Sequence, residues 1–315
     1  MQPTARSLIL DLLSTLRKGS MSVRALVEAA HLLGIEENNV RVSLARLYAS
    51  GRVERDERGR YRLGHAVAAM SHRLRSWRDL DTRTEEWNGD WIAVHRAKLG
   101  RGPARRRCEK AFELLGFRDL EPGLAIRPNN LRGGVSSVRE QLIALALGPV
   151  SEANASSGRE PGQTAVGRGL LGRIFITSEF DPSSDLEARS LWDADGLAGE
   201  TKTETKALAA SLDRLSALSS AEAMTETFLV GGRVLRFLMR HPLLPEPILA
   251  PAPLAMLLEQ MREYDRRGRD AWATFLAEHD VPHRGLPLDS RSESIAPAPA
   301  NRASSLPEPG TGESK

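Results

Sequence analysis

The sequence is poor in the residues that disulfides, metal centres and membrane spans require. Its 315 residues include a single cysteine, Cys108, which excludes an intramolecular disulfide framework and is compatible with a reducing cytoplasm. The seven histidines are scattered, and none pairs with another histidine or a cysteine at metal-ligand spacing. No apolar run approaches the roughly 20 residues of a membrane span, and the N-terminus lacks a signal-peptide pattern. We therefore predict a cytoplasmic protein with no membrane contact, metal or other cofactor.

Charge is distributed unevenly along the chain. The first 78 residues carry 14 Lys and Arg against 7 Asp and Glu, whereas the remaining residues carry 30 against 34. A basic N-terminal region joined to a mildly acidic remainder is typical of a polyanion-binding module attached to something else. The chain is also longer than the chains that a single hydrophobic core usually stabilises, so we expect several domains.

The N-terminal region has the pattern of three short helices followed by a hairpin. Leucine and isoleucine at helical spacing predict a first helix that stops at Gly19 and a second that stops at Gly34. A third helix is predicted from about Glu37 to Ser50, and the stretch "RVERDERGRYRL" after Gly51 reads as two strands around a turn. The order helix, turn, amphipathic helix and basic hairpin is typical of a winged helix-turn-helix.

The third helix carries the candidate DNA-reading residues. Its apolar stripe leaves amide, guanidinium and small side chains on the other faces, which suits close approach to base edges in the major groove. Arginines near the hairpin tip can reach phosphates or the minor groove. The alternative is an ordinary three-helix core with a solvated hairpin. The predicted DNA-binding residues are Asn38, Asn39, Arg41, Val42, Ser43, Arg46, Arg58 and Arg60.

The middle of the chain has a β-α-β-β-α-β pattern. A strand is predicted at Trp91–His95, followed by a helix that ends at Gly116 and a hairpin turn at 121–123. A further helix comes next, and a Gly/Ser-rich loop at 151–169 separates it from an apolar strand. This order is that of the split βαβ, or ferredoxin-like, fold.

The remaining segments complete an α+β multidomain chain. Residues 183 to about 280 look wholly helical, and the Ser/Pro/Glu-rich end from Arg284 looks disordered. A connecting helix at 65–80 carries an apolar stripe that we expect to join domains or to contact a second copy, formed by Val67, Met70, Leu74 and Trp77. The predicted domains are 1–80, 81–180, 181–283 and a tail at 284–315.

The sequence does not favour an enzyme. A metal-dependent nuclease built on the middle fold would need an acidic residue at the end of its first strand. That strand ends at His95, and Asp90 stands at its other end. No nucleophile elbow or phosphate-binding loop is present either.

An arginine cluster around the start of the predicted middle helix is a candidate phosphate site. A guanidinium group can donate two hydrogen bonds to phosphate oxygens, and the positive end of a helix dipole favours an anion. The target could be a CoA pyrophosphate or flanking DNA. The cluster comprises Arg101, Arg105, Arg106 and Arg107. The alternative is a solvated helix face beside Glu109 and Glu113. Trp192 could line an apolar pocket for a ligand or fill the core, and the core is the commoner role for a single tryptophan.

Several blocks spread over residues 5–280 occur in a characteristic order, namely "ARSLILDLL", "LGIEENNVRVSLARL", "GRYRL", "WNGDW", "RRRCEKAFELLGF", "LEPGLAIRPNNL", "ARSLWDADGLA" and "RFLMRHPLLPEPILAP". In this order they resemble the phenylacetate-catabolism repressor family, the PaaX type. The resemblance implies a winged-helix head, a ferredoxin-like (Cas2-like) middle and a helical C-terminal domain. It also implies a dimeric operon repressor that an aryl-acyl-CoA, such as phenylacetyl-CoA, releases from double-stranded operator DNA.

The chain departs from the family pattern mainly in its C-terminal half. Ala45 stands where a serine is usual, His241 stands where an aspartate is usual, and "PAPLA" replaces a "DWPG"-like block; the tyrosine expected after "WDADGLA" is missing. These departures concern the effector more than the DNA. A ligand-responsive homodimeric repressor is thus the predicted function, and a constitutive DNA-binding or architectural protein is the alternative.

Overall fold

The computed structural model describes all residues except 1–2, 17–18, 65–75, 148–168, 170 and 282–315. It is a mixed α+β structure with two small sheets. The chain divides into two units, Met1–His283 and Arg284–Lys315, and the second lies outside the described residues. The predicted Gly/Ser-rich loop lies almost wholly outside them, and the predicted disordered tail does so entirely.

The N-terminal elements follow the predicted order of three helices and a hairpin. Thr4 and Ser7 form a capping box at the start of the first helix, and the Ser22 hydroxyl caps the second by accepting from the Ala25 N–H. The apolar faces of the three helices close on one core. The elements are α1 (Ala5–Thr15), α2 (Val23–His31), α3 (Glu37–Ala49), β1 (Val53–Arg55) and β2 (Tyr61–Leu63).

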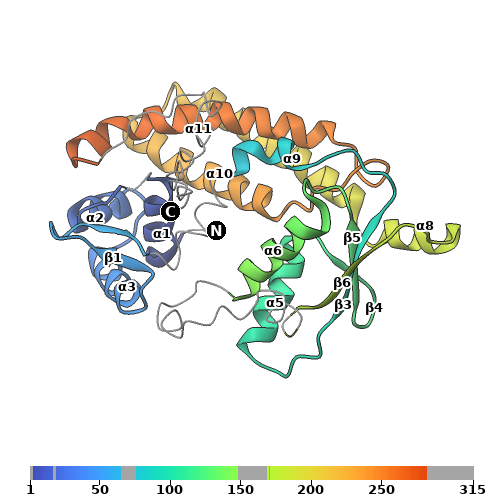
Figure 1. The fold of residues 1–315 in the computed structure, drawn as a ribbon. Helices are drawn as coiled ribbons and strands as arrows, with labels where there is room; N and C mark the ends of the chain where they lie inside the picture. The colour runs from blue at the N-terminus through green and yellow to red at the C-terminus, as the bar shows by residue number, and fades with distance from the viewer. Residues whose placement is uncertain (1–2, 17–18, 65–75, 148–168, 170, 282–315) are drawn as a thin grey trace, which may run out of the picture. The chain divides into compact units, whose positions relative to one another are not determined.

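The middle of the chain folds into a four-stranded antiparallel sheet with strand order β4-β5-β3-β6. Helices α5 and α6 pack against each other on one face of it (Figure 1). The element order matches the predicted β-α-β-β-α-β pattern. The bounds are β3 (Trp91–Arg96), α5 (Pro103–Leu114), β4 (Arg118–Glu121), β5 (Leu124–Pro128), α6 (Gly134–Leu147) and β6 (Gly172–Thr177).

Strand β3 is buried on both faces of the sheet. Its Ile92 and Val94 side chains join the cluster that includes α5 and α6, whereas Trp91 and Ala93 join a different cluster. Successive side chains in a strand point to opposite faces, so these two clusters lie on opposite sides of the sheet.

The C-terminal part of the chain is helical apart from short turns at 191–193 and 216–219 and the longer segment 241–251, where the prediction of continuous helices fails. The helices are α8 (Pro182–Ser190), α9 (Ala194–Leu215), α10 (Ser220–Arg240) and α11 (Ala252–Glu278). Helices α9, α10 and α11 pack side by side (Figure 1) and contribute to the same apolar cluster as α5 and α6. A buried hydrogen bond of 2.7 Å joins Ser211 on α9 to the Tyr264 hydroxyl on α11.

The predicted connecting helix differs from the structure where it is described. Residues Ser76–Arg83 form a 3₁₀ helix, η1, and Trp77 is only 3% exposed. Trp77 is therefore part of the core, not of an exposed stripe for a second copy; Val67, Met70 and Leu74 lie outside the described residues. Two ion pairs, Arg78–Asp265 at 2.6 Å and Arg262–Asp81 at 2.8 Å, join η1 to α11. In the part of the chain that the structure describes, no helix is long and apolar enough to cross a membrane.

Candidate nucleic-acid interface

Helix α3 buries one face and leaves the predicted reading residues outside. Val40, Leu44 and Leu47 are at most 3% exposed and pack on α1 and α2, which confirms the predicted inward face. The outer positions are exposed at Asn38, Asn39, Arg41, Val42 and Arg46 and half-buried at Ser43. The helix therefore presents a polar face free of core contacts.

The two arginines of α3 differ in their partners. Arg41 forms a 2.6 Å ion pair with Glu37 one turn earlier, and both side chains are about half exposed. An exposed pair of this kind is worth only about 0.3–0.5 kcal/mol, so a base or phosphate can displace it. The Arg46 side chain makes no hydrogen bond or ion pair with any described residue. Both guanidinium groups are thus accessible to a ligand.

Two apolar side chains on the same helix are unusually exposed. Val42 is 41% exposed and was among the predicted contacts, whereas Tyr48, at 54%, was missed. The Tyr48 ring packs edge-on against Tyr61 of β2, with ring centroids 6.3 Å apart. Tyr48 follows Leu47 directly and so lies at the flank of the buried stripe, which is the signal that could have identified it. If α3 entered a major groove, its exposed apolar groups would suit contact with thymine methyl groups.

The hairpin between β1 and β2 is held by its own turn residues. The Asp56 carboxylate accepts from the backbone N–H groups of Arg60 (2.8 Å) and Arg58 (3.1 Å), and these bonds lower the pKa of Asp56. Gly59 has a φ of +75°, which non-glycine residues rarely adopt. The Arg58 side chain is exposed near this ordered tip. Its placement fits the predicted phosphate contact.

Arg60 does not project freely from the hairpin as predicted. Its guanidinium donates to the Ser20 carbonyl at 2.8 Å, to the His279 carbonyl at 3.3 Å and to the Asp280 carbonyl at 3.2 Å. The last two carbonyls belong to the two residues that follow α11, more than 200 residues away in sequence. Arg60 therefore ties the hairpin to the C-terminal helix.

Other contacts hold the end of α11 against the N-terminal helices. His279 Nε2 lies 2.9 Å from a carboxylate oxygen of Glu28 on α2, and the His279 side chain is only 8% exposed. Val281 is buried in the core that α1, α2 and α3 share. Helix α11 thus contacts η1, and the residues that follow it contact the N-terminal three-helix unit.

The arginine cluster on α5 is only partly available to a ligand. Arg105 pairs with Glu109 at 2.7 Å, and Arg107 donates from Nε to the Ala146 carbonyl at the end of α6, at 2.9 Å. The Arg101 and Arg106 side chains are exposed, and neither has a hydrogen-bond or ion-pair partner among the described residues. The two cations best placed for an anionic ligand are therefore Arg101 and Arg106.

Trp192 lies in a different part of the molecule from the arginine cluster. It is 5% exposed, donates from Nε1 to the Gly116 carbonyl at 3.1 Å and stacks on Trp91 at a centroid distance of 6.0 Å. Trp91 belongs to the sheet face opposite α5. Trp192 thus fills the core, the alternative that the sequence left open, and does not share a site with Arg101–Arg107.

Known proteins resemble the chain in fold and, over its N-terminal part, in sequence. Its fold is similar to that of the uncharacterized protein Rv0674 from Mycobacterium tuberculosis, with a TM-score of 0.52, 22% sequence identity, and 85% of this chain and 98% of that chain covered. At that identity the likeness shows the fold alone. No curated protein matches the chain. The PaaX-like protein family model matches residues 4–67, which comprise α1, α2, α3 and the hairpin. Residues 4–67 are therefore similar to the PaaX-like protein family.

Proposed function

We propose that this protein is a transcriptional repressor that binds double-stranded operator DNA through α3 and the β1–β2 hairpin. The observation that carries the proposal is the exposed polar face of α3, which lies in the region of the PaaX-like match. The helix enters the major groove, where Arg41 or Arg46 reads a base, while Arg58 on the hairpin contacts phosphate. A cytoplasmic location fits this role.

In this proposal each of three parts of the chain has its own role. Residues 1–80 form a winged-helix head, 81–180 a ferredoxin-like (Cas2-like) middle, and 181–283 a helical domain for effector binding and dimerisation. Support comes from the order of the elements, from the sheet order and from the family match. The proposal gives none of the parts a catalytic role. Turnover of a nucleic acid or thioester by the purified protein would therefore contradict it.

Arginine substitutions on α3 test the proposed groove contact. Arg46→Ala or Arg41→Ala should weaken operator binding by about 1–3 kcal/mol and relax sequence preference at one position, because alanine cannot form the bidentate hydrogen bonds to a base edge. Arg24→Ala on α2 is the matched control, since Arg24 also forms an exposed ion pair one turn away, with Glu28. Unchanged affinity and specificity in both α3 variants, measured by fluorescence anisotropy, would refute the docking.

The proposed effector is an aryl- or acyl-CoA that releases the repressor from DNA. Its support is the family resemblance together with the exposed, unpartnered cations Arg101 and Arg106. Release requires that the ligand prefer the conformation that fits the operator poorly; a coupling of about 1–3 kcal/mol changes operator affinity roughly 5- to 150-fold.

A panel of CoA thioesters tests the effector by thermal shift, because a ligand of the folded state raises the melting temperature. Arg101→Glu with Arg106→Glu should abolish the shift and leave operator binding in place. Arg107 is best left intact, since its side chain joins α5 to α6. Free acids should act far more weakly than thioesters. No binding of any CoA ester at millimolar concentration would favour a constitutive DNA-binding protein instead.

The repressor is proposed to act as a homodimer on a two-fold-related operator. Two recognition helices would then meet half-sites about one helical turn, or a multiple of it, apart. The support is the large helical part beyond what DNA reading requires. Light scattering that finds a monomer at micromolar concentration, both free and on DNA, would contradict this arrangement.

A further inference from the structure

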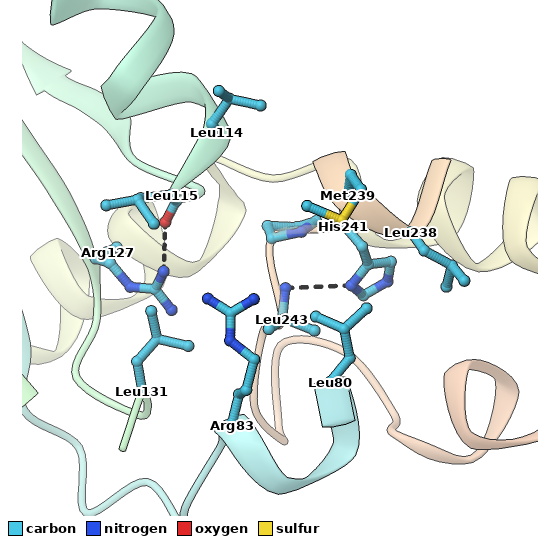
Figure 2. Close-up of a pocket in the computed structure, with 11 residues that line it drawn as sticks. Leu80, Arg83, Leu114, Leu115, Arg127, Leu131, Leu238, Met239, His241 and Leu243 are labelled. Carbon is cyan, nitrogen blue, oxygen red and sulfur yellow. Dashed lines mark hydrogen bonds between the residues drawn. The ribbon is translucent and has the colours of Figure 1, made fainter. Parts of the chain in front are cut away.

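A small cavity lies where η1, the sheet and the end of α10 meet (Figure 2). Leucines form much of its wall, including Leu80, Leu115 and Leu131. Three of its lining side chains carry nitrogen donors, namely Arg83, Arg127 and His241, and no aspartate or glutamate lines it. None of these three residues belongs to the DNA interface or to the arginine cluster on α5.

Arg127 is a fully buried cation without a carboxylate partner among the described residues. It is 1% exposed and donates to the carbonyls of Leu115 and Pro128 and to the Asn130 side chain. Burial lowers the pKa of Arg127 to about 9, with a smaller contribution from Arg83, so the side chain remains charged at pH 7. Neutral acceptors solvate this charge but do not neutralise it.

Arg83 brings a second positive charge to the same place. Its guanidinium faces that of Arg127 in Figure 2, and its one hydrogen bond to a described side chain goes to Gln141, at 3.1 Å. Burial lowers the pKa of Arg83 as well. Arg83 is half-buried and Arg127 is fully buried, so the two like charges repel each other with less hydration than at the open surface. An anion between or beside them would therefore be favoured.

His241 adds a buried donor to the cavity wall. It is 6% exposed, and its Nδ1 accepts from the Leu243 backbone N–H at 3.1 Å (Figure 2). The neutral ring must then carry its proton on Nε2. That atom is buried and has no hydrogen-bond partner in the part of the chain that the structure describes. A buried N–H without an acceptor is unfavourable unless a ligand or water completes it.

We propose that this cavity binds a compact monoanion, either the carboxylate group of a short acid or an ion of the size of chloride, through N–H groups of Arg83, Arg127 and His241. The lining favours an anion, because it offers two cations and a further N–H donor but no carboxylate. A bound monoanion would offset one of the two arginine charges and accept a hydrogen bond from His241 Nε2. It would also join η1 and β5 to the residues after α10.

The size of the cavity limits the ligand. Its volume is about 20 Å³, whereas a single water needs roughly 10–15 Å³ on the same measure. One or two water-sized groups therefore fit, but an aromatic acyl chain, a CoA moiety or a four-oxygen phosphate does not. The site is thus distinct from the proposed CoA effector site and does not depend on it.

Thermal unfolding of the full chain tests the site. Sodium formate, acetate or chloride is titrated at constant ionic strength, with gluconate as a monoanion too bulky to enter. We expect a saturating rise in Tm of about 2–4 °C with at least one small anion, because a ligand of the folded state stabilises it. A larger effect of formate or acetate identifies a carboxylate site; a larger effect of chloride identifies a halide site.

Two variants make the test specific. Arg83→Met should abolish the rise, whereas Arg132→Met, which removes an exposed charge next to the cavity-lining Leu131, should keep it. An equal rise in Arg83→Met, or with gluconate, would overturn the proposal.

A crystal soaked in sodium bromide gives an independent readout on the unmodified chain, should Arg83→Met fail to fold. We expect an anomalous peak beside the Arg83 and His241 nitrogens. An empty cavity would overturn the proposal. A peak without any saturable rise in Tm would also overturn it, since that is an adventitious ion only.

Discussion

Replacing Arg60 by methionine separates two roles for this residue. The sequence predicts a phosphate contact, while the structure shows the side chain bonded to Ser20 and to the carbonyls of His279 and Asp280. Methionine keeps much of the aliphatic stem but removes every donor. The variant should therefore lack the tie between the hairpin and α11.

The expected decrease in stability follows from the bond lengths. The 2.8 Å bond to the Ser20 carbonyl is the strongest, and a hydrogen bond from a charged donor is worth about 1.5–3 kcal/mol. The bonds to the α11 end are 3.2–3.3 Å long and half-exposed, so water partly replaces them and each adds only a few tenths. The total is about 2–3 kcal/mol, or roughly 5–10 °C in Tm.

Thermal unfolding and the salt dependence of DNA binding together provide the assay. Arg60→Met should lower Tm and leave the slope of log affinity against log salt unchanged. Arg58→Met is the control, because Arg58 is exposed and its side chain has no partner among the described residues. It should leave Tm unchanged and make the slope shallower by about 0.9, the change expected when one phosphate is no longer neutralised by the protein. The opposite pattern, with Arg60→Met flattening the slope at unchanged Tm, would refute the assignment of Arg60 as an anchor.

Three further predictions concern the body of the protein. Trp192→Phe should lower the free energy of unfolding by about 2–4 kcal/mol, because the Gly116 carbonyl loses its donor and the core loses volume. The response to CoA thioesters should not change. Loss of that response without loss of stability would place Trp192 in an effector site. Burial lowers the pKa of His241 to about 4 from an ordinary 6.5. The folded state therefore binds fewer protons than the unfolded state between these values, so stability present above pH 6.5 should fall by up to about 3 kcal/mol toward pH 4; denaturant titrations of the wild type and His241→Asn should differ in this slope, and equal slopes would contradict the assignment. Gly172→Ala should cost about 2–4 kcal/mol, since φ is +98° and the new Cβ would lie 2.1 Å from the His95 carbonyl oxygen; Gly199→Ala, on a helix with nothing within 4 Å, is the control and should stabilise slightly.

Sequence reasoning predicted the elements well where the signal is local. The capping residues Thr4 and Ser22 mark the starts of α1 and α2, and the three-residue and four-residue spacing of Val40, Leu44 and Leu47 identified the buried face of α3. Periodicity and caps depend on neighbours within one turn, so they can be read without a fold. The same reasoning predicted a continuous connecting helix, but Ser76–Arg83 forms a 3₁₀ helix whose Trp77 is drawn into the core beside α11.

For the candidate site as well, some features follow from the local sequence and others only from the tertiary structure. The sequence by itself determined the order of helices and strands, the outer face of α3 and the basic character of the hairpin, because these follow from residue type and short-range spacing. Only the tertiary structure decided that Arg60 donates to the backbone just after α11 and that Trp192 lies across the sheet from the arginine cluster. It also decided that Arg83, Arg127 and His241 line one cavity. The physical reason is that a side chain's partners depend on groups far away in sequence, such as the His279 carbonyl for Arg60, and no local pattern encodes which distant acceptor the fold brings within 3.3 Å.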